Sequence, residues 1–203
     1  NAESDFRQLL KQISEEAAIS PKISTSVVKY DRVEDAVDDI SSKQQVDYVV
    51  LGTKGATGLK KVMMGSNAVA VIKKCKKPVI TVPEHAKFKE IHNLVYSSEL
   101  HDVNRELSIL ISFAEVFNSH IHIVHVDSPG LLSETDISNK ELELKEACKY
   151  SLVTIKTFQK ATIADALDIY IDDISADMLA MFTHKTTFLE IIFGKSVTQE
   201  MAY

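Results

Sequence analysis

Five residues around one loop have the types and the spacing to bind an anion: Gly52, Gly55, Gly65, Ser66 and Asn67. Glycine permits positive φ and lets a ligand reach the backbone without meeting a Cβ atom. Gly65 and Ser66 stand where a helical pattern begins, and the free N–H groups and the dipole of a helix start favour an anion. The Ser66 hydroxyl and the Asn67 amide add polar groups within reach of a phosphate. We therefore predict a cofactor-binding site at these five residues, with a phosphate chain as the group that they hold.

A purely structural interpretation stays open at this point. In it, Gly52 and Gly55 serve turns, and Ser66 only caps its helix. Two familiar phosphate motifs do not fit this chain. The dinucleotide pattern G-x-G-x-x-G is absent, and "GKS" at residues 194–196 lacks the first glycine of a P-loop, because Leu189 occupies that position.

Three histidines lie in the apolar run at residues 120–126: His120, His122 and His125. On a strand, His120 and His122 share a face and His125 points to the other. Zinc needs a third and a fourth ligand, and the sequence identifies none, so we predict no metal site. No nucleophile with a nearby base occurs in a recognisable catalytic motif. We therefore predict no catalytic residue and do not expect an enzyme.

The glycine loop lies in a chain that alternates strands with helices. The predicted strands are residues 22–30, 46–52, 78–83, 91–98, 120–126, 152–158 and 177–182, and the predicted helices are residues 5–17, 32–43, 66–77, 104–118, 139–151 and 163–174, with another from about residue 196. This alternation implies an α/β fold, in which an open parallel sheet is covered by helices on both faces. Ligands of such sheets lie at the carboxyl ends of the strands. We expect Gly52 just past the end of its strand and Ser66 as the N-cap of its helix.

The chain also repeats itself at an offset of 130 residues. "EDAVD" at residues 34–38 meets "ADALD" at 164–168, Thr53 meets Thr183, and Ser66 meets Ser196. The shared order of helix, strand, loop and helix indicates two tandem units. We place the first at residues 1–84, with its front half absent, and the second at residues 85–203, with its final strand absent.

The spacing Gly52, Gly55, Gly65, Ser66 resembles the G-x2-G-x9-G-[S/T] signature of the universal stress protein family. The surrounding "VLGTKGATGLKKVMMGSNAVAVI" and "KKPVITVP" are also similar to that family, and "LVYSSE" resembles its first strand and loop. The resemblance implies a tandem member with the Rossmann-like fold of the adenine nucleotide alpha hydrolases. It further implies ATP or a related adenine nucleotide, with or without Mg, as the cofactor at the five site residues, in a regulatory module for stress response.

The second unit departs from this signature. At the offset of 130, Phe182 stands for Gly52, Lys185 for Gly55 and Lys195 for Gly65. Side chains at these positions would fill the space that phosphates need. We therefore expect no nucleotide in the second repeat.

Composition limits the partners. The formal net charge of −6 argues against a nucleic-acid partner, and no apolar run reaches the roughly 18 residues of a membrane span. Cys75 and Cys148 have no disulfide-framework spacing, which favours the cytoplasm. An alternative to nucleotide binding is an interaction protein of the same fold that works through dimerisation. Because an incomplete sheet leaves pairing edges, we expect a homodimer or a swapped assembly.

Overall fold

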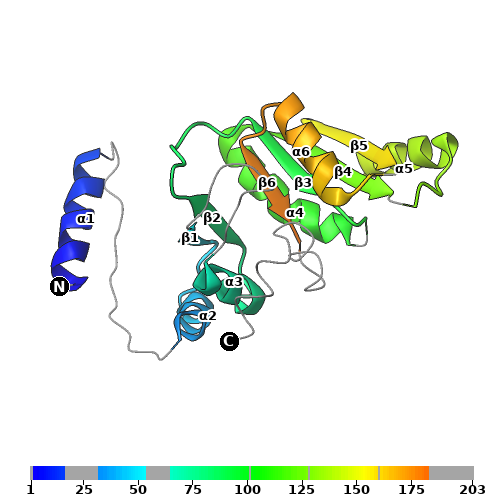
Figure 1. Cartoon of the computed structure of the whole chain (residues 1–203). Helices are drawn as coiled ribbons and strands as arrows, with labels where there is room; N and C mark the ends of the chain where they lie inside the picture. Colours follow the sequence, from blue (N-terminus) through cyan, green and yellow to red (C-terminus); the bar gives the residue numbers. More distant parts are fainter. Residues whose placement is uncertain are drawn as a thin grey trace.

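The computed structural model describes residues 2–16, 32–53, 65–100, 102–127, 129–159 and 161–182 (Figure 1). The elements follow one another as α1 (Ala2–Glu16), α2 (Val33–Lys43), β1 (Val49–Thr53), α3 (Ser66–Lys74), β2 (Val79–Pro83), β3 (Asn93–Ser97), α4 (Val103–Phe117), β4 (His120–Asp127), α5 (Glu134–Ala147), β5 (Val153–Gln159), α6 (Ile163–Asp173) and β6 (Met178–Met181). The predicted strand at 22–30 and the predicted helix from about residue 196 lie outside the described residues.

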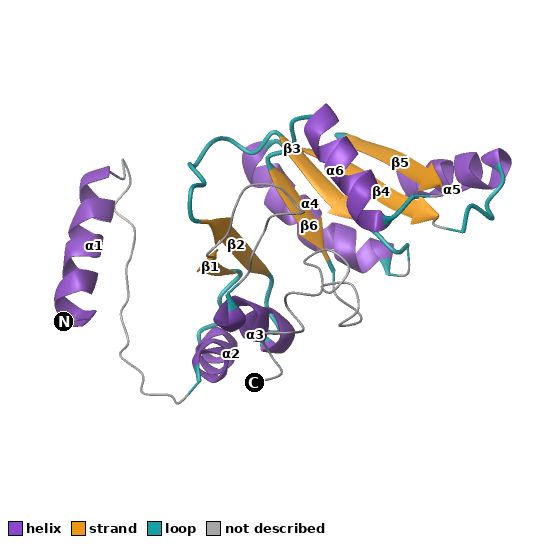
Figure 2. Ribbon diagram, viewed as in Figure 1, coloured by secondary structure: helices purple, strands orange, loops and turns teal. Residues whose placement is uncertain are grey.

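The strands form two parallel sheets, as Figure 2 shows. One sheet pairs β1 with β2, and the other has the order β5-β4-β3-β6. Every pair is parallel, because each strand returns to its sheet through a helix. The predicted α/β fold with parallel sheets and helices is therefore confirmed.

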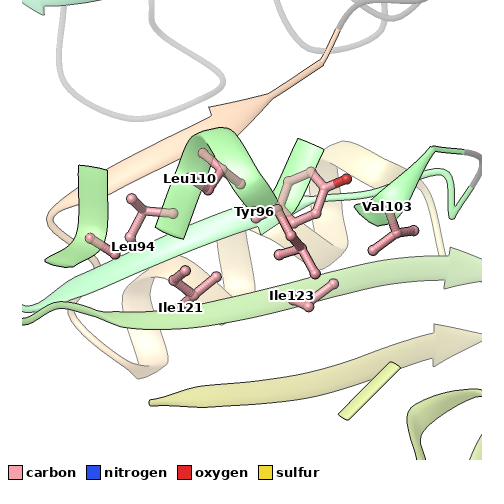
Figure 3. Close-up of a cluster of buried hydrophobic side chains, with 8 residues drawn as sticks. Leu94, Tyr96, Val103, Leu110, Ile121 and Ile123 are labelled. Atoms are coloured by element: carbon pink, nitrogen blue, oxygen red, sulfur yellow. The ribbon is translucent and has the colours of Figure 1, made fainter. Parts of the chain in front are cut away.

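β3 is one of the two inner strands of the larger sheet and is buried on both faces. Leu94 and Tyr96 point into a cluster that contains α4 residues, and Val95 points into a second cluster with Leu167 of α6. Figure 3 shows Leu94, Tyr96, Ile121 and Ile123 gathered under Leu110 and Val103. Apolar residues on both sides of the strand fit a sheet that is covered by helices on both faces.

The covering helices follow from their apolar spacing. On α4, Val103, Leu107, Leu110 and Ala114 recur at helical intervals and face the sheet. On α6, Ala166 and Leu167 are buried, whereas Ile169 is 65% exposed. The two helices thus lie on opposite faces of β3.

The smaller sheet is covered on one face by α3. Leu51 of β1 packs against Ala68 and Val69 of α3. α2 packs in turn on α3, where Lys74 forms an ion pair with Asp35. Because Lys74 and Asp35 are both partly exposed, apolar packing contributes more to this layer than the ion pair does.

Two helices of the structure match at the predicted offset of 130 residues. α2 and α6 have equal lengths, and each bound of α6 lies 130 residues after the matching bound of α2. Both helices end in the same way, with φ of 51° at Gln45 and 50° at Ser175. The shared geometry covers helix, turn and following strand, while the predicted unit boundaries at 84 and 85 stay a prediction.

One helix begins earlier than the sequence pattern indicated. We expected a helix at residues 139–151, and α5 starts at Glu134. The reason is a capping box, in which Ser133 Oγ accepts the Asp136 N–H at 3.1 Å and the Asp136 carboxylate accepts the Ser133 N–H at 3.0 Å. A reciprocal polar cap extends a helix beyond its apolar pattern.

The α6 contact with β3 can be tested by truncation. Leu167→Ala removes a side chain with no exposed surface, and we expect a loss of about 2–5 kcal/mol in the free energy of unfolding. Ile169→Ala, on the exposed side of the same helix, is the matched control and should change it by about 0.5 kcal/mol or less. Urea unfolding measures both, and equal losses would contradict the packing described.

Candidate functional site

The predicted site residues come together because α3 packs on β1. Gly52 lies in β1 opposite Val82 of β2, and Gly65 directly precedes α3. The contact of Leu51 with Ala68 and Val69 places the end of the strand beside the start of the helix. Gly52, Gly65, Ser66 and Asn67 therefore lie in one region at the carboxyl end of β1, whereas Gly55 lies outside the described residues.

Two expectations about this region are wrong in detail. Gly52 is within β1, because the strand runs on to Thr53, whose hydroxyl lies 3.5 Å from the Val82 carbonyl. The N-cap of α3 is Gly65, with φ −63° and ψ 148°, and Ser66 is the first helical residue. The extended backbone of Gly65 supplies the turn into the helix one residue earlier than expected. Because its N-cap residue is glycine, α3 has no capping hydrogen bond from an N-cap side chain.

Neither packing nor backbone geometry accounts for glycine at two of these positions. A Cβ atom added to Gly52 or to Gly65 would meet nothing within 4 Å in the described part of the chain. Among the glycines in the described ranges, only Gly130 has positive φ, so a turn with positive φ does not explain glycine at position 52. Ser66 and Asn67 are exposed beside them. Within the described residues, no atom covers the Cβ side of Gly52 or Gly65.

The corresponding place in the second unit is filled. Phe182, the counterpart of Gly52, stacks edge-to-face on Tyr96 with ring centroids 5.7 Å apart and packs on the core of the larger sheet. Lys185 and Lys195 lie outside the described residues. The aromatic ring occupies the position that glycine leaves open in the first unit, which favours the expectation that the second repeat takes no nucleotide.

A buried polar network closes the carboxyl end of β3. The Tyr96 hydroxyl donates to the Glu106 carboxylate and accepts from Ser98 Oγ at 2.9 Å, and Ser98 Oγ accepts the Leu100 N–H at 3.1 Å. Burial, and next the hydrogen bond to Glu106, raises the pKa of Tyr96. Sequence reasoning missed this pair. The sequence feature that could have indicated the pair is Glu106, an acidic residue inside the apolar stripe of α4.

The histidines of β4 serve structure. His120 and His122 stack with ring centroids 4.4 Å apart. The His122 Nε2–H donates to Asn93 Oδ1 at 3.2 Å, and the Tyr170 hydroxyl donates to His122 Nδ1 at 3.1 Å. Burial, and next the neighbouring His120, lowers the pKa of His122 to about 4. Within the described ranges, no three acidic, histidine or cysteine side chains gather as metal ligands would.

Comparison with known proteins shows similarity to one family over part of the chain. The sequence model of the universal stress protein family matches residues 2–83. The resemblance predicted from the glycine signature is therefore confirmed over that segment. No curated protein matches the chain. Of the helices in the described residues, none has the length and apolarity to cross a membrane.

Solved structures extend the likeness to the whole fold. A universal stress protein from Archaeoglobus fulgidus DSM 4304 is similar with a TM-score of 0.65 and 17% identity, over 100% of this chain and 72% of that one. A putative universal stress protein from Pseudomonas aeruginosa UCBPP-PA14 gives 0.61 and 14%, over 97% of this chain and 73% of that one. The described helices and sheets thus have the fold of universal stress proteins.

The His122 contacts lead to a pH prediction. His122 takes up a proton near its ordinary pKa of 6.5 when unfolded but only near 4 when folded. Its contribution to stability is therefore complete above pH 6.5 and is lost as the pH falls toward 4. We expect His122→Gln to remove this part of the pH dependence in urea unfolding.

His92→Gln is the control for this prediction, because it removes an imidazole whose side chain is 67% exposed. The pH dependence of the His92→Gln variant should follow the wild type. A wild-type stability that stays flat between pH 6.5 and 4 would contradict the burial of a neutral His122.

Proposed function

We propose that the protein is a nucleotide-binding regulatory module of the universal stress protein type. Its ligand is ATP or a related adenine nucleotide, with or without Mg, held at Gly52, Gly55, Gly65, Ser66 and Asn67. The observation that carries the proposal is the open space at Gly52 and Gly65, where an added Cβ atom would meet no described atom within 4 Å. Glycine without a conformational or packing reason fits a backbone that a ligand approaches.

The start of α3 suits the phosphates of such a ligand. The first N–H groups of a helix have no partner inside the helix, and the N-cap residue of α3, Gly65, has no side chain that could accept from them. Ser66 and Asn67 are exposed there, so backbone N–H groups, a hydroxyl and an amide are available to phosphate oxygens. The helix dipole adds a favourable field for negative charge.

The second unit takes no nucleotide in this proposal. Phe182 fills the place of Gly52 and contacts Tyr96. In this proposal the molecule is a tandem pair of units with one nucleotide-binding site. Its regulatory activity depends on whether that site holds a ligand. We propose little or no catalysis, since the sequence offers no nucleophile and base in a recognised motif. We also propose a cytoplasmic location, which the cysteine usage supports.

A second candidate function is favoured by exposed apolar residues on the smaller sheet. Val50 is 63% exposed and Val82 is 38% exposed. An interaction protein that works without nucleotide would use such a surface for a partner. The two functions differ in one readily measured property, which is stabilisation by nucleotide.

A graded substitution at Gly52 tests the binding site. Thermal and urea unfolding with and without ATP should show stabilisation of the wild type, about 2.7 kcal/mol when free ATP is 100 times the dissociation constant. Gly52→Ala should reduce this gain and Gly52→Val should abolish it, because each added carbon enters the space that the ligand needs.

The unliganded variants are the control for this test. Since no described atom lies near the added Cβ, Gly52→Ala and Gly52→Val should keep the free energy of unfolding of the unliganded wild type to within about 0.5–1 kcal/mol. A wild type that gains no stability from ATP, ADP or AMP would exclude the nucleotide proposal and leave the interaction function.

A further inference from the structure

An open hollow of about 790 Å³ lies beside α6 on the larger sheet. Its walls are the last turns of α6 and the edge strand β5, which is the outermost strand beyond α6 in Figure 1. The lining residues are Lys156 and Phe158 of β5 and Ile169, Tyr170, Asp172 and Asp173 of α6. Its volume is within the range of small-molecule sites. The nucleotide proposed above lies at β1 of the other sheet, so this hollow is a separate place.

The floor of the hollow is aromatic. The rings of Phe158 and Tyr170 meet edge-to-face with centroids 5.9 Å apart, and both pack on the cluster around Leu167. The Tyr170 hydroxyl already donates to His122, so the hollow offers a ligand the rings and not this hydroxyl. The face of an aromatic ring carries the negative end of its quadrupole and attracts cations.

Two carboxylates of the hollow lie at an unfavourable end of their helix. Asp172 and Asp173 are exposed and occupy the last turn of α6, which contains no basic residue. The helix dipole is negative at this end, so it disfavours carboxylates and favours a cation. Burial, and next the carboxylate of Asp173, raises the pKa of Tyr170, which places Asp173 near the aromatic floor. A positive group bound here would interact with both carboxylates and with the dipole.

A cation of the chain itself already uses the floor. Lys156 Nζ lies 6.0 Å from the centroid of the Phe158 ring, a separation typical of cation–π contacts. Lys156 is an exposed residue, and a lysine of this kind can turn its ammonium group into water. The Phe158 ring is therefore accessible to a positive group, and a ligand can take the place of Lys156. The charge of Lys156 also limits that ligand, because a second ammonium group would be repelled.

We propose that the hollow binds a small organic cation with a single positive charge and an apolar body, such as an arylalkyl amine. The ammonium group lies between the two carboxylates and the Tyr170 ring. The apolar body covers Phe158 and Ile169, which is 65% exposed. The site belongs to the larger sheet and does not depend on nucleotide, so its failure and the failure of the proposed function are separate results.

The charge requirement can be tested with benzylammonium and with benzyl alcohol, its neutral analogue of similar shape. Titration of the ¹⁵N-labelled chain with benzylammonium should shift the N–H signals of residues 156–158 and 169–175 in NMR spectra. Benzyl alcohol should bind about 10-fold more weakly, because it forms no cation–π contact and no ion pair. The dication of 1,4-diaminobutane should also bind more weakly than benzylammonium, because Lys156 repels its second charge.

Substitutions in the hollow should change the affinity in opposite directions. Asp172→Asn combined with Asp173→Asn should weaken benzylammonium binding about 10-fold, whereas Lys156→Met should strengthen it about 3-fold. Glu143→Gln combined with Glu146→Gln is the matched control, because it removes the same charge from exposed sites on α5. This control should leave the affinity unchanged. An equal loss in the control would mean that the net charge of −6 alone attracts the cation, and it would overturn the proposal.

Urea unfolding without ligand separates binding from folding. The variant with asparagine at positions 172 and 173 should keep or raise the unfolding midpoint, because two carboxylates leave the negative end of α6. Benzyl alcohol binding as tightly as benzylammonium, or an unchanged affinity without the two carboxylates, would contradict the site. Nα-acetyl-lysine methylamide offers an ammonium group without an aromatic body and should bind more weakly than benzylammonium. Tighter binding of this compound would indicate a lysine side chain of a protein partner and would overturn the assignment to a small amine.

Discussion

The burial of β3 on both faces is the constraint from which most of the structure follows. Leu94 and Tyr96 need an apolar cover on one side and Val95 needs one on the other. α4 and α6 supply these covers, and a right-handed return through each helix keeps all strands parallel. Parallel strands bring their carboxyl ends to one edge. Hydrophobic packing therefore determines at which edge of the sheet a ligand site at the strand ends can lie. Polar groups determine only which ligand that edge can bind.

The same constraint distinguishes the two sheets. In the larger sheet, the partly buried strand β6 follows α6 and packs on the α4 cluster at one face and on the α6 cluster at the other. In the smaller sheet, β1 is covered by α3, while Val50 stays exposed. The sequences of the two strands are similarly apolar, so the pattern alone does not distinguish a covered strand from an uncovered one. What distinguishes them is which helices are present nearby, and this is a property of topology.

The sequence predicts features that core packing imposes better than features that local contacts determine. Periodicity and the offset of 130 were sufficient for the fold class and for the matching α2 and α6, because core faces impose regular spacing. They did not predict the features that depend on local polar contacts or on the local backbone. Ser133 and Asp136 extend α5 beyond its apolar pattern, and the backbone at Gly65 moves the start of α3 by one residue. The Tyr96–Glu106 pair joins a strand to a helix through the core, and no spacing rule predicts such a contact.

Gly52 and Phe182 show how one strand position serves opposite purposes. Both follow an apolar strand, which follows a helix and a turn of the same geometry. Phe182 adds an aromatic contact to the core, which is the stabilising choice at a position of this kind. Gly52 forgoes that contact and leaves its Cβ side open, although glycine in a strand costs stability. Gly52 neither packs on the core nor forms a turn with positive φ. The folding of its own chain therefore does not explain why this residue is glycine. In the function proposed above, a ligand that approaches the carboxyl end of β1 provides the reason, and no ligand is proposed at Phe182.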